Sequence, residues 1–350
     1  MTPTHPQGPA DDGPPLPIWR RRSGIYVFLG LLTVATSVGS LYVGTGDLDN
    51  ASLADTFLTL RALRTAAAFL AGAALAVGGV LVQGLFRNPL ASPSVVGTTA
   101  GAMLGGQLVL LMFQALLNQS GILQTVPMDM LVPLGCTVGA FIALSLLFIL
   151  HRTGDDLVVL LLFGFLLSHL FLAFSGFITS LAQARWELAR AIVSFTLGDV
   201  SGVSLRQVQF VAPLVGVGMA AAYAWGNTLD IMLSGEEEAQ TLGVDVAVVR
   251  RYVVLWTAVL TAAAVSLGGN IGFVGLVVPH SLRPFLGVAH RGLVLGCALL
   301  GGCLVVACDT LTRAIPSSTE IPLGSVTSLV GGPLFIYLLF RSRKELHDGG

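Results

Sequence analysis

Lysine, and charge of either sign, are scarce in this sequence. Lys344 is the only lysine among the 350 residues. Charged residues make up 11% of the chain, whereas a soluble domain carries roughly 25%. Hydrophobic residues make up 54%, and the mean hydropathy is +0.83. A chain with so little polar surface cannot remain in water as a folded domain, so the composition predicts an integral membrane protein.

The shortage of lysine also limits the chemistry. A P-loop needs a lysine directly after its second glycine to reach the terminal phosphates, and Lys344 follows Arg343. The chain is therefore predicted not to hydrolyse nucleotide through a P-loop, so any ATP-driven process needs a separate ATPase polypeptide. Neither an HExxH nor a GxSxG motif occurs, and we predict no catalytic residues and no cofactor.

Cysteine is also rare. The four cysteines are Cys136, Cys297, Cys303 and Cys308, all in apolar segments and none in a CxxC pair. This pattern indicates small hydrophobic residues within helices, and it predicts neither a disulfide framework nor a metal site. The formal net charge of −1 argues against a nucleic-acid partner.

Long apolar runs fill most of the chain. About 20 apolar residues, rising 1.5 Å each, cross the roughly 30 Å hydrocarbon core of a bilayer. The candidate spans are 24–44, 60–84, 94–117, 130–150, 156–180, 207–226, 247–267, 271–288, 292–314 and 323–340. The predicted fold is an all-α polytopic membrane bundle of about ten transmembrane helices over residues 23–341. Residues 1–22, which are rich in Pro, Gly and Asp at the start, are predicted to form a disordered tail, and 342–350 a second tail.

Basic residues in the loops orient the bundle. Placing Met1 inside puts 12 of the 18 basic residues on the cytoplasmic side, as the positive-inside rule requires. Both termini are then predicted to be cytoplasmic, which needs an even number of spans. Arg61, Arg64 and Arg313 fall on the outer side, and the amphipathic break at 181–206 is predicted to hold a short interfacial helix.

A turn and a loop are predicted on the cytoplasmic side. Two prolines four residues apart, in the stretch 87–93 that begins Arg87-Asn88-Pro89, cannot continue a helix and fix the shape of the turn. The loop 230–251 is the longest polar insertion, and Glu236–Glu238 stand where a short helix begins. Leu242 and Gly243 suit the end of that helix. Either a simple connector or a docking element for a soluble partner fits each segment.

A third segment, 268–283, combines glycines with Pro279 and predicts an interrupted or tightly packed helix. His280 is interpreted as satisfying a carbonyl freed by the proline, although an ionisable residue at this depth is also a functional candidate. His169 is expected to pack within the bundle. Asp309 and Arg313 are four apart on one helix and predict a local ion pair.

Five stretches, in this order and spacing, resemble the permease family of ABC importers for iron-siderophores, haem and cobalamin. They are RALR at 61–64, GAALAVGGVLVQ leading into RNPLASP, EEEAQTLGV at 236–244, GFVGLVVPHSLR at 272–283, and EIPLG followed by GPLF at 332–335. The resemblance runs from about Asp55 to Arg341. It implies ten helices in each subunit of a homodimer, two cytoplasmic ATPase subunits, an extracytoplasmic substrate-binding protein, and a substrate path along the two-fold axis in the lipid bilayer.

The resemblance also assigns roles to residues. It implies that Arg61, Arg64 and Arg313 dock the binding protein, and that the 236–244 loop sits in a groove of the ATPase. The coupling residues implied are Glu236, Glu237, Ala239, Leu242, Gly243 and Val244. The turn at Arg87, Asn88 and Pro89 matches a family motif. The pathway and gate residues implied are Leu162, Phe165, Gly198, Asp199, Pro279 and His280.

The sequence departs from the family pattern at several positions. Leu63 and Asn270 stand where the family often has proline, and Thr196 and Asp199 where it often has tryptophan and serine. Asp199 lies near the implied pathway, so these departures bear most on the cargo that the resemblance implies. An iron chelate or haem is the expected cargo, with cobalamin as the alternative. An ion-gradient-driven transporter or channel, an intramembrane enzyme and a membrane scaffold are the rival classes.

Overall fold

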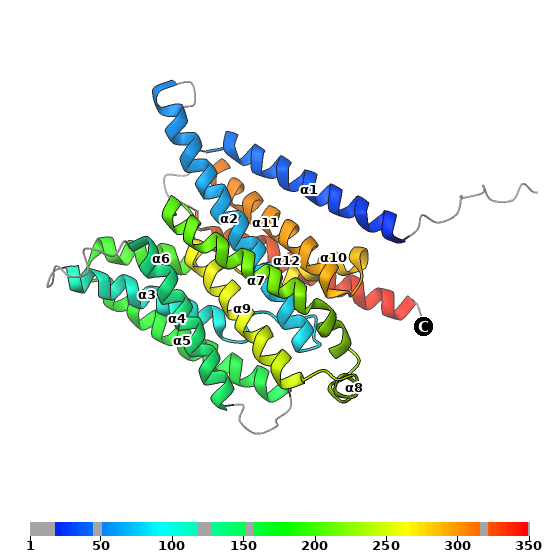
Figure 1. Ribbon diagram of the computed structural model, residues 1–350. Coiled ribbons are helices and arrows are strands. Elements are labelled where there is room, and N and C mark those ends of the chain that lie inside the picture. Colours follow the sequence, from blue (N-terminus) through cyan, green and yellow to red (C-terminus); the bar gives the residue numbers. More distant parts are fainter. Residues whose placement is uncertain (1–17, 45–50, 118–127, 151–156, 316–320, 349–350) are drawn as a thin grey trace, which may run out of the picture.

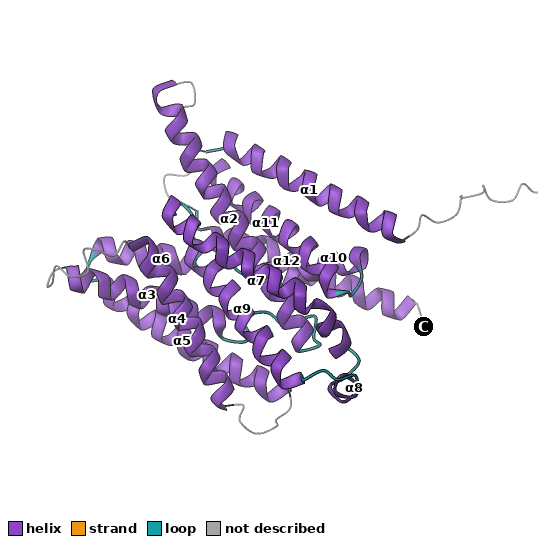
Figure 2. Ribbon diagram, viewed as in Figure 1, coloured by secondary structure: helices purple, strands orange, loops and turns teal. Residues whose placement is uncertain are grey.

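The computed structural model describes residues 18–44, 51–117, 128–150, 157–315 and 321–348, and all regular structure in these residues is helical (Figure 2). The helices are α1 (Ile18–Tyr42), α2 (Ala51–Leu85), α3 (Thr98–Leu117), α4 (Met128–Leu150), α5 (Leu157–Ala182), α6 (Trp186–Leu197), α7 (Leu205–Met232), α8 (Glu236–Thr241), α9 (Val246–Gly268), α10 (Val274–Leu286), α11 (His290–Ala314) and α12 (Leu323–Asp348). The prediction of an all-helical membrane fold is confirmed.

Each predicted span overlaps one helix, and the remaining two helices are short. The predicted interfacial helix is α6, with 12 residues, and the predicted helix in the polar loop is α8, with 6. Seven helices are long and apolar enough to cross a membrane, and α3 and α12 carry shorter apolar stretches. With 13 residues, α10 is about 20 Å long, too short for a crossing. The count of ten spans therefore stays a prediction.

Several predicted boundaries were wrong. α3 begins at Thr98 and not at 94, because Gly97 has φ +88° and cannot belong to a right-handed helix. α2 begins at Ala51 and not at 60, since a helix continues past the end of its apolar run. For the same reason α1 and α12 reach into the segments predicted as tails.

The centre of the bundle is α2, which packs against α7, α9, α10 and α11 (Figure 1). Its buried face consists largely of alanine, glycine and valine. A Cβ added to Gly72 would collide with the backbone of Gly301 in α11, and one on Gly79 with the backbone of Gly275 in α10. The predicted tight packing of the GAALAVGGVLVQ stretch is thereby confirmed, as expected where van der Waals contact drives helix association.

α3 and α4 form a second close pair. Gly101 and Gly105 meet Gly135 and Gly139 so closely that any Cβ would collide with the facing backbone. Spacing of small residues by four places them on one face of each helix, which is the packing pattern of membrane helices. The four cysteines are buried and unpaired, as the sequence predicted.

The outer surface is apolar in the way a bilayer requires. On α1, Val27, Phe28, Leu31 and Val34 are each more than 60% exposed. A soluble protein does not expose a contiguous apolar face of this kind. The exposed face of α1 is the type of surface that hydrocarbon covers.

Candidate functional site

The segment that links α7 to α9 forms a knob on one end of the bundle, which we call the α8 end. Ala239 is fully buried and anchors α8 on the bundle, and Glu236 accepts a hydrogen bond from Arg250 of α9 at 2.9 Å. Leu242 is 68% exposed and Gly243 has φ +83° directly after the helix. The predicted end of this helix is confirmed, and Leu242 is the apolar side chain that the knob presents.

The coupling residues named from the sequence therefore divide into two kinds. Glu237, Leu242 and Gly243 are exposed and available to a partner. Ala239 lies inside the bundle and can act only as an anchor. The carbonyl of Ala239 accepts a hydrogen bond from the Val244 amide at 3.0 Å, which closes the turn after α8.

A polar joint at the base of this knob was missed by sequence reasoning. At the end of α7, the Asp230 carboxylate accepts from the backbone amide of His290 at 2.9 Å, and its Oδ1 lies 2.6 Å from His290 Nδ1. The His290 ring is buried and rests on the backbone of Gly84 in α2. Asp230 thus links the end of α7 to the start of α11, and the His290 ring carries the contact on to α2. Two residues 60 positions apart give no periodic signal by which the joint could have been predicted.

The turn after α2 lies near the same end. Arg87 has φ +49° and is exposed, and Asn88 accepts a hydrogen bond from the Leu90 amide at 2.9 Å. Pro89 is exposed as well. The predicted fixed turn is confirmed, and its exposed residues face away from the core.

The arginines predicted to dock a partner meet at the opposite end of α11, which we call the arginine end. Arg64 Nε donates to Asp309 Oδ1 at 2.8 Å, and Arg313 Nη2 lies 3.1 Å from Asp309 Oδ2, which confirms the predicted Asp309–Arg313 ion pair. Arg61 donates to the carbonyls of Leu41 and Gly44 at 2.9 and 3.1 Å.

Arg313 completes this cluster by donating to the carbonyls of Ser40 and Val43. The cluster ties the ends of α1, α2 and α11 together around Asp309, which is fully buried. Three guanidinium groups and one carboxylate leave a formal charge of +2. The arginines thus have a structural role in addition to the docking role predicted from the sequence.

Of the predicted pathway residues, those on α5 lie on the surface of this chain, whereas Gly198, directly after α6, is buried and Asp199 is partly exposed. Leu162 is 57% and Phe165 50% exposed on α5. Gly198 ends α6 with φ +85°, and its carbonyl accepts from the Leu323 amide at 2.8 Å. Asp199 accepts from the hydroxyls of Ser194 and Ser201 at 2.8 and 2.6 Å, so it ties the last turn of α6 to the turn that follows.

Pro279 and His280 lie apart from these residues. Both belong to α10, which packs mainly on α2, α11 and α12, whereas α5 packs on α3, α4 and α6. Pro279 lies within α10 and does not interrupt it; the interruption is at 269–273.

The interpretation of both histidines was wrong. His280 Nδ1 is buried without a hydrogen-bond partner among the described residues, and the ring packs edge-on against Phe335, so it satisfies no freed carbonyl through this nitrogen. His169 is exposed on α5, although the sequence suggested that it packs inside the bundle.

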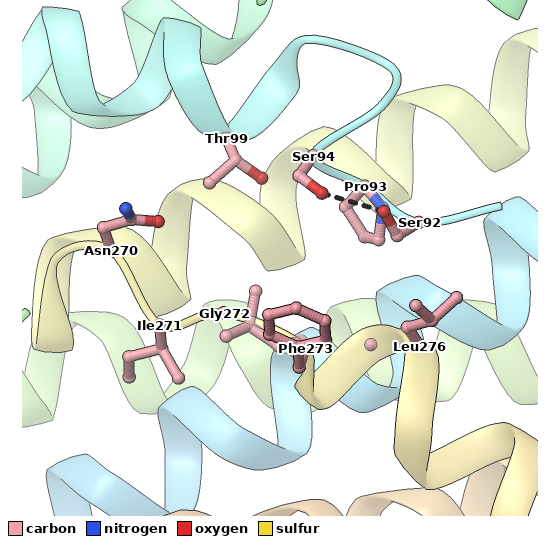
Figure 3. Close-up of a pocket in the computed structure, with 11 residues that line it drawn as sticks. Ser92, Pro93, Ser94, Thr99, Asn270, Ile271, Gly272, Phe273 and Leu276 are labelled. Carbon is pink, nitrogen blue, oxygen red and sulfur yellow. Dashed lines mark hydrogen bonds between the residues drawn. The ribbon is translucent and has the colours of Figure 1, made fainter. Parts of the chain in front are cut away.

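A cavity of about 270 Å³ lies where the turn after α2 meets the interruption before α10 (Figure 3). Ser92, Ser94 and Thr99 line one side of it, and Asn270 and Phe273 the other. Leu75 and Leu276 contribute apolar walls. Phe273 has φ +64°, a left-handed conformation that is a genuine strain for a bulky residue.

Curated relatives cover nearly the whole chain. It is 33% identical over 328 residues to the hemin transport system permease protein HmuU of Yersinia pestis, which is 91% of this chain and 96% of that protein. It is 36% identical over 287 residues to the cobalamin import system permease protein BtuC of Halobacterium salinarum, covering 80% and 72%. It is 34% identical over 287 residues to the iron(3+)-hydroxamate import system permease protein FhuB of Bacillus subtilis, covering 82% and 72%.

A solved structure shares the fold as well. A metal-chelate type ABC transporter in an inward-facing conformation aligns with a TM-score of 0.79 and 29% identity, over 91% of this chain and 99% of that one. With its long apolar helices, the chain is a multi-pass protein of the cytoplasmic membrane. The model of the FecCD transport family matches residues 25–341, and the chain belongs to that family.

Proposed function

We propose that this chain is the membrane-spanning permease subunit of an ATP-driven importer for an iron chelate or haem. The match of the FecCD transport family over residues 25–341 carries the proposal. A cobalamin is the second candidate cargo, because the relatives include cobalamin permeases at a similar identity. ATP hydrolysis belongs to a separate subunit, since the only lysine follows Arg343 and not the glycine that a P-loop requires.

The proposed assembly is a homodimer with ten spans per subunit, both termini in the cytoplasm, and two ATPase subunits. In this arrangement the α8 end is cytoplasmic. The exposed Leu242, on a helix anchored through Ala239 and the Glu236–Arg250 ion pair, suits insertion into a groove of the ATPase. The exposed turn at Arg87–Pro89 lies on the same side.

The arginine end then faces an extracytoplasmic substrate-binding protein. Because Arg61 is only 6% exposed, the cluster has little surface for direct ion pairs. Its formal charge of +2 can still orient an acidic partner, since charge acts over about 8 Å at physiological ionic strength. We therefore assign the cluster to orientation of the binding protein, with Arg64 as its most exposed ion-pair member.

Transport is proposed to proceed by alternating access. Closure of the ATPase dimer displaces α8, and the Asp230–His290 joint passes that displacement to α11 and, through Gly84, to α2. The two subunits then rock against each other and open the path between them, which α5, Gly198 and Asp199 border, to alternate sides.

The test is purification of the chain together with its ATPase, followed by ATPase assays in lipid with and without the loaded binding protein. We expect a stable complex whose activity rises with the loaded binding protein. Ligand retained on that protein identifies the cargo. A chain that binds no ATPase and accumulates cargo along an ion gradient would refute the proposal in favour of a secondary transporter.

A substitution on the knob tests the coupling role. Leu242→Asp keeps the fold, because the side chain is 68% exposed, and is expected to abolish the stimulated ATPase activity. The matched control is Leu205→Asp, on a leucine that is 53% exposed at the far end of α7. Stimulation that survives Leu242→Asp contradicts the assignment of α8.

A further inference from the structure

The cavity between residues 92–99 and 270–276 lies deep within the span region. Ser168 Oγ donates to the Ser94 carbonyl at 2.8 Å, and Ser168 is in the middle of the apolar stretch Val159–Ala182. Pro93 contacts α2 at Gly78, seven residues before that helix ends. Because α10 is about 20 Å long, residues 269–273 also lie below the membrane surface.

Polar groups are exposed at this depth. Ser92 and Ser94 pair their hydroxyls at 2.8 Å on the exposed side of the turn. Asn270 is exposed, and its side-chain amide forms no hydrogen bond within the part of the chain that the structure describes. Each unsatisfied polar group in hydrocarbon costs several kcal/mol, and irregular backbone at membrane depth occurs only inside protein or beside water. The cavity therefore opens onto water or onto another protein surface, and not onto lipid.

The polar side chains that line the cavity are uncharged. Its side-chain polar groups are hydroxyls and one amide, and no ionisable residue lines it. These neutral donors and acceptors match carbonyl, amide and hydroxyl groups, whereas a carboxylate would meet no cation. A volume of about 270 Å³ is below the roughly 300–1,000 Å³ of pockets that enclose drug-sized ligands, so the cavity suits one edge of a larger molecule.

The cavity also adjoins the proposed path. Gly198, one of the predicted pathway residues, packs so closely on the Asn270 carbonyl that an added Cβ would lie 2.6 Å from it. His169, next to Ser168 on α5, is exposed at a similar depth.

We propose that Ser92, Ser94, Thr99 and Asn270 form a cargo-contact site that hydrogen-bonds neutral amide, carbonyl or hydroxyl groups of the transported chelate. This inference rests on the proposed importer function and narrows its cargo. Ferric hydroxamates and cobalamin both carry such groups, whereas hemin presents carboxylates and an apolar ring. The site thus favours an amide-bearing cargo over haem.

The first experiment needs no cargo. Ser94→Cys and Asn270→Cys are treated, in vesicles opened to both faces, with a positively charged, membrane-impermeant thiol reagent. The native cysteines are buried and provide a low background. We expect both variants to react at least tenfold faster than Leu31→Cys, which is 66% exposed on the apolar face of α1. If both react as slowly as Leu31→Cys while Glu237→Cys in α8 reacts rapidly, the cavity is not aqueous and the inference fails.

The second experiment measures uptake in proteoliposomes containing the full complex, with ferrichrome, cobalamin and hemin as probes. Asn270→Leu and Ser94→Ala each remove hydrogen bonds worth about 0.5–1.5 kcal/mol. We expect the uptake of ferrichrome or cobalamin, whichever the wild type transports, to fall about 2- to 10-fold. Uptake of hemin, if any, should change less than 2-fold. The control is Ser145→Ala, which removes an exposed hydroxyl of α4 that bonds only its own helix.

The outcomes separate this inference from the proposed function. Wild-type protein that imports hemin alone, or variants that slow all three probes equally, would overturn the cargo-contact site but leave the importer intact. Wild-type protein that imports none of the probes while driven by ATP argues against the proposed cargo classes, and the thiol reactivity still decides whether the cavity is wet.

Discussion

The two ends of α11 hold their neighbours by opposite means. At the arginine end, Asp309 is fully buried and binds Arg64 and Arg313, while Arg61 and Arg313 bind carbonyls that follow α1 or close it. At the α8 end, His290 is buried but its partner Asp230 has a side chain 33% exposed. This joint, together with the bond from Arg291 Nε to the Tyr223 carbonyl, ties α7 to α11 before the exposed knob at α8.

This difference between the arginine end and the α8 end indicates which end holds its helices rigidly and which end can move when α8 is displaced. A buried carboxylate with two guanidinium partners cannot be separated from them without leaving charge in a low dielectric, so the arginine end locks three helices together. The Asp230–His290 pair at the start of α11 is partly reached by water, so it holds less strongly and can transmit a displacement. The rigid end and the responsive end are joined by two helices, α11 and α2.

The largest expected effect is at the rigid end. Asp309→Ala leaves Arg64 and Arg313 without their shared carboxylate, and breaking a buried ion pair in this way costs about 3–5 kcal/mol. We expect a large fall in the free energy of unfolding, measured by reversible denaturation in detergent. The control is Asp55→Ala, which removes an exposed carboxylate of α2. Equal free energies of unfolding for the two variants would show that Asp309 does not hold α1, α2 and α11 together.

A smaller effect is expected at the responsive end. Asp230→Asn and His290→Gln each weaken a charge-assisted hydrogen bond worth about 1.5–3 kcal/mol. Because the joint precedes the knob, we expect these variants to lose most of the stimulated ATPase activity of the complex. Their free energy of unfolding should fall by less than that of Asp309→Ala. A double-mutant cycle measures the coupling between Asp230 and His290 directly. A coupling energy near zero would remove the joint from the proposed mechanism.

The smallest effect is expected for the ion pair that steadies the knob. Glu236 and Arg250 have side chains 31% and 19% exposed, and pairs near the surface contribute about 0.2–1 kcal/mol. Glu236→Gln should lower stability within that range, and the loss should shrink at high salt because ions screen the pair. A loss as large as that of Asp309→Ala would mean that the two ends do not differ as described.

Much of the fold could be predicted from the sequence, because apolar length alone decides where a helix can lie in a bilayer. The run between Val159 and Ala182 allows no other structure, and the end of α8 at Leu242–Gly243 followed from local glycine chemistry. The predicted start of α3 was wrong because hydropathy does not show that residues 94–97 form turns that end at Gly97. Hydropathy also gave no sign that α10 is too short to cross.

The sites were predicted only in part. The Asp309–Arg313 pair is local, with a spacing of four, and sequence alone identified it. The second partner of Asp309, Arg64, is 245 positions away, and no pattern in one sequence connects them. The same holds for Asp230 and His290. Both histidines in α5 and α10 were interpreted incorrectly, since exposure in a membrane bundle depends on which face a neighbouring helix covers.

The sequence by itself determined that this protein lies in a membrane, that it is helical, and that ATP hydrolysis through a P-loop is not its own. The first two follow from composition, because transfer free energies add along the chain. The third follows from position, because the only lysine, Lys344, stands after Arg343 and not after a glycine. Only the tertiary structure decided that three arginines meet one carboxylate, that Asp230 reaches His290, and that Ser94 and Asn270 face the same cavity. These contacts depend on how the helices pack, and in a bilayer that packing is set by close fit between small residues such as Gly79 and Gly275, which have no signature in hydropathy.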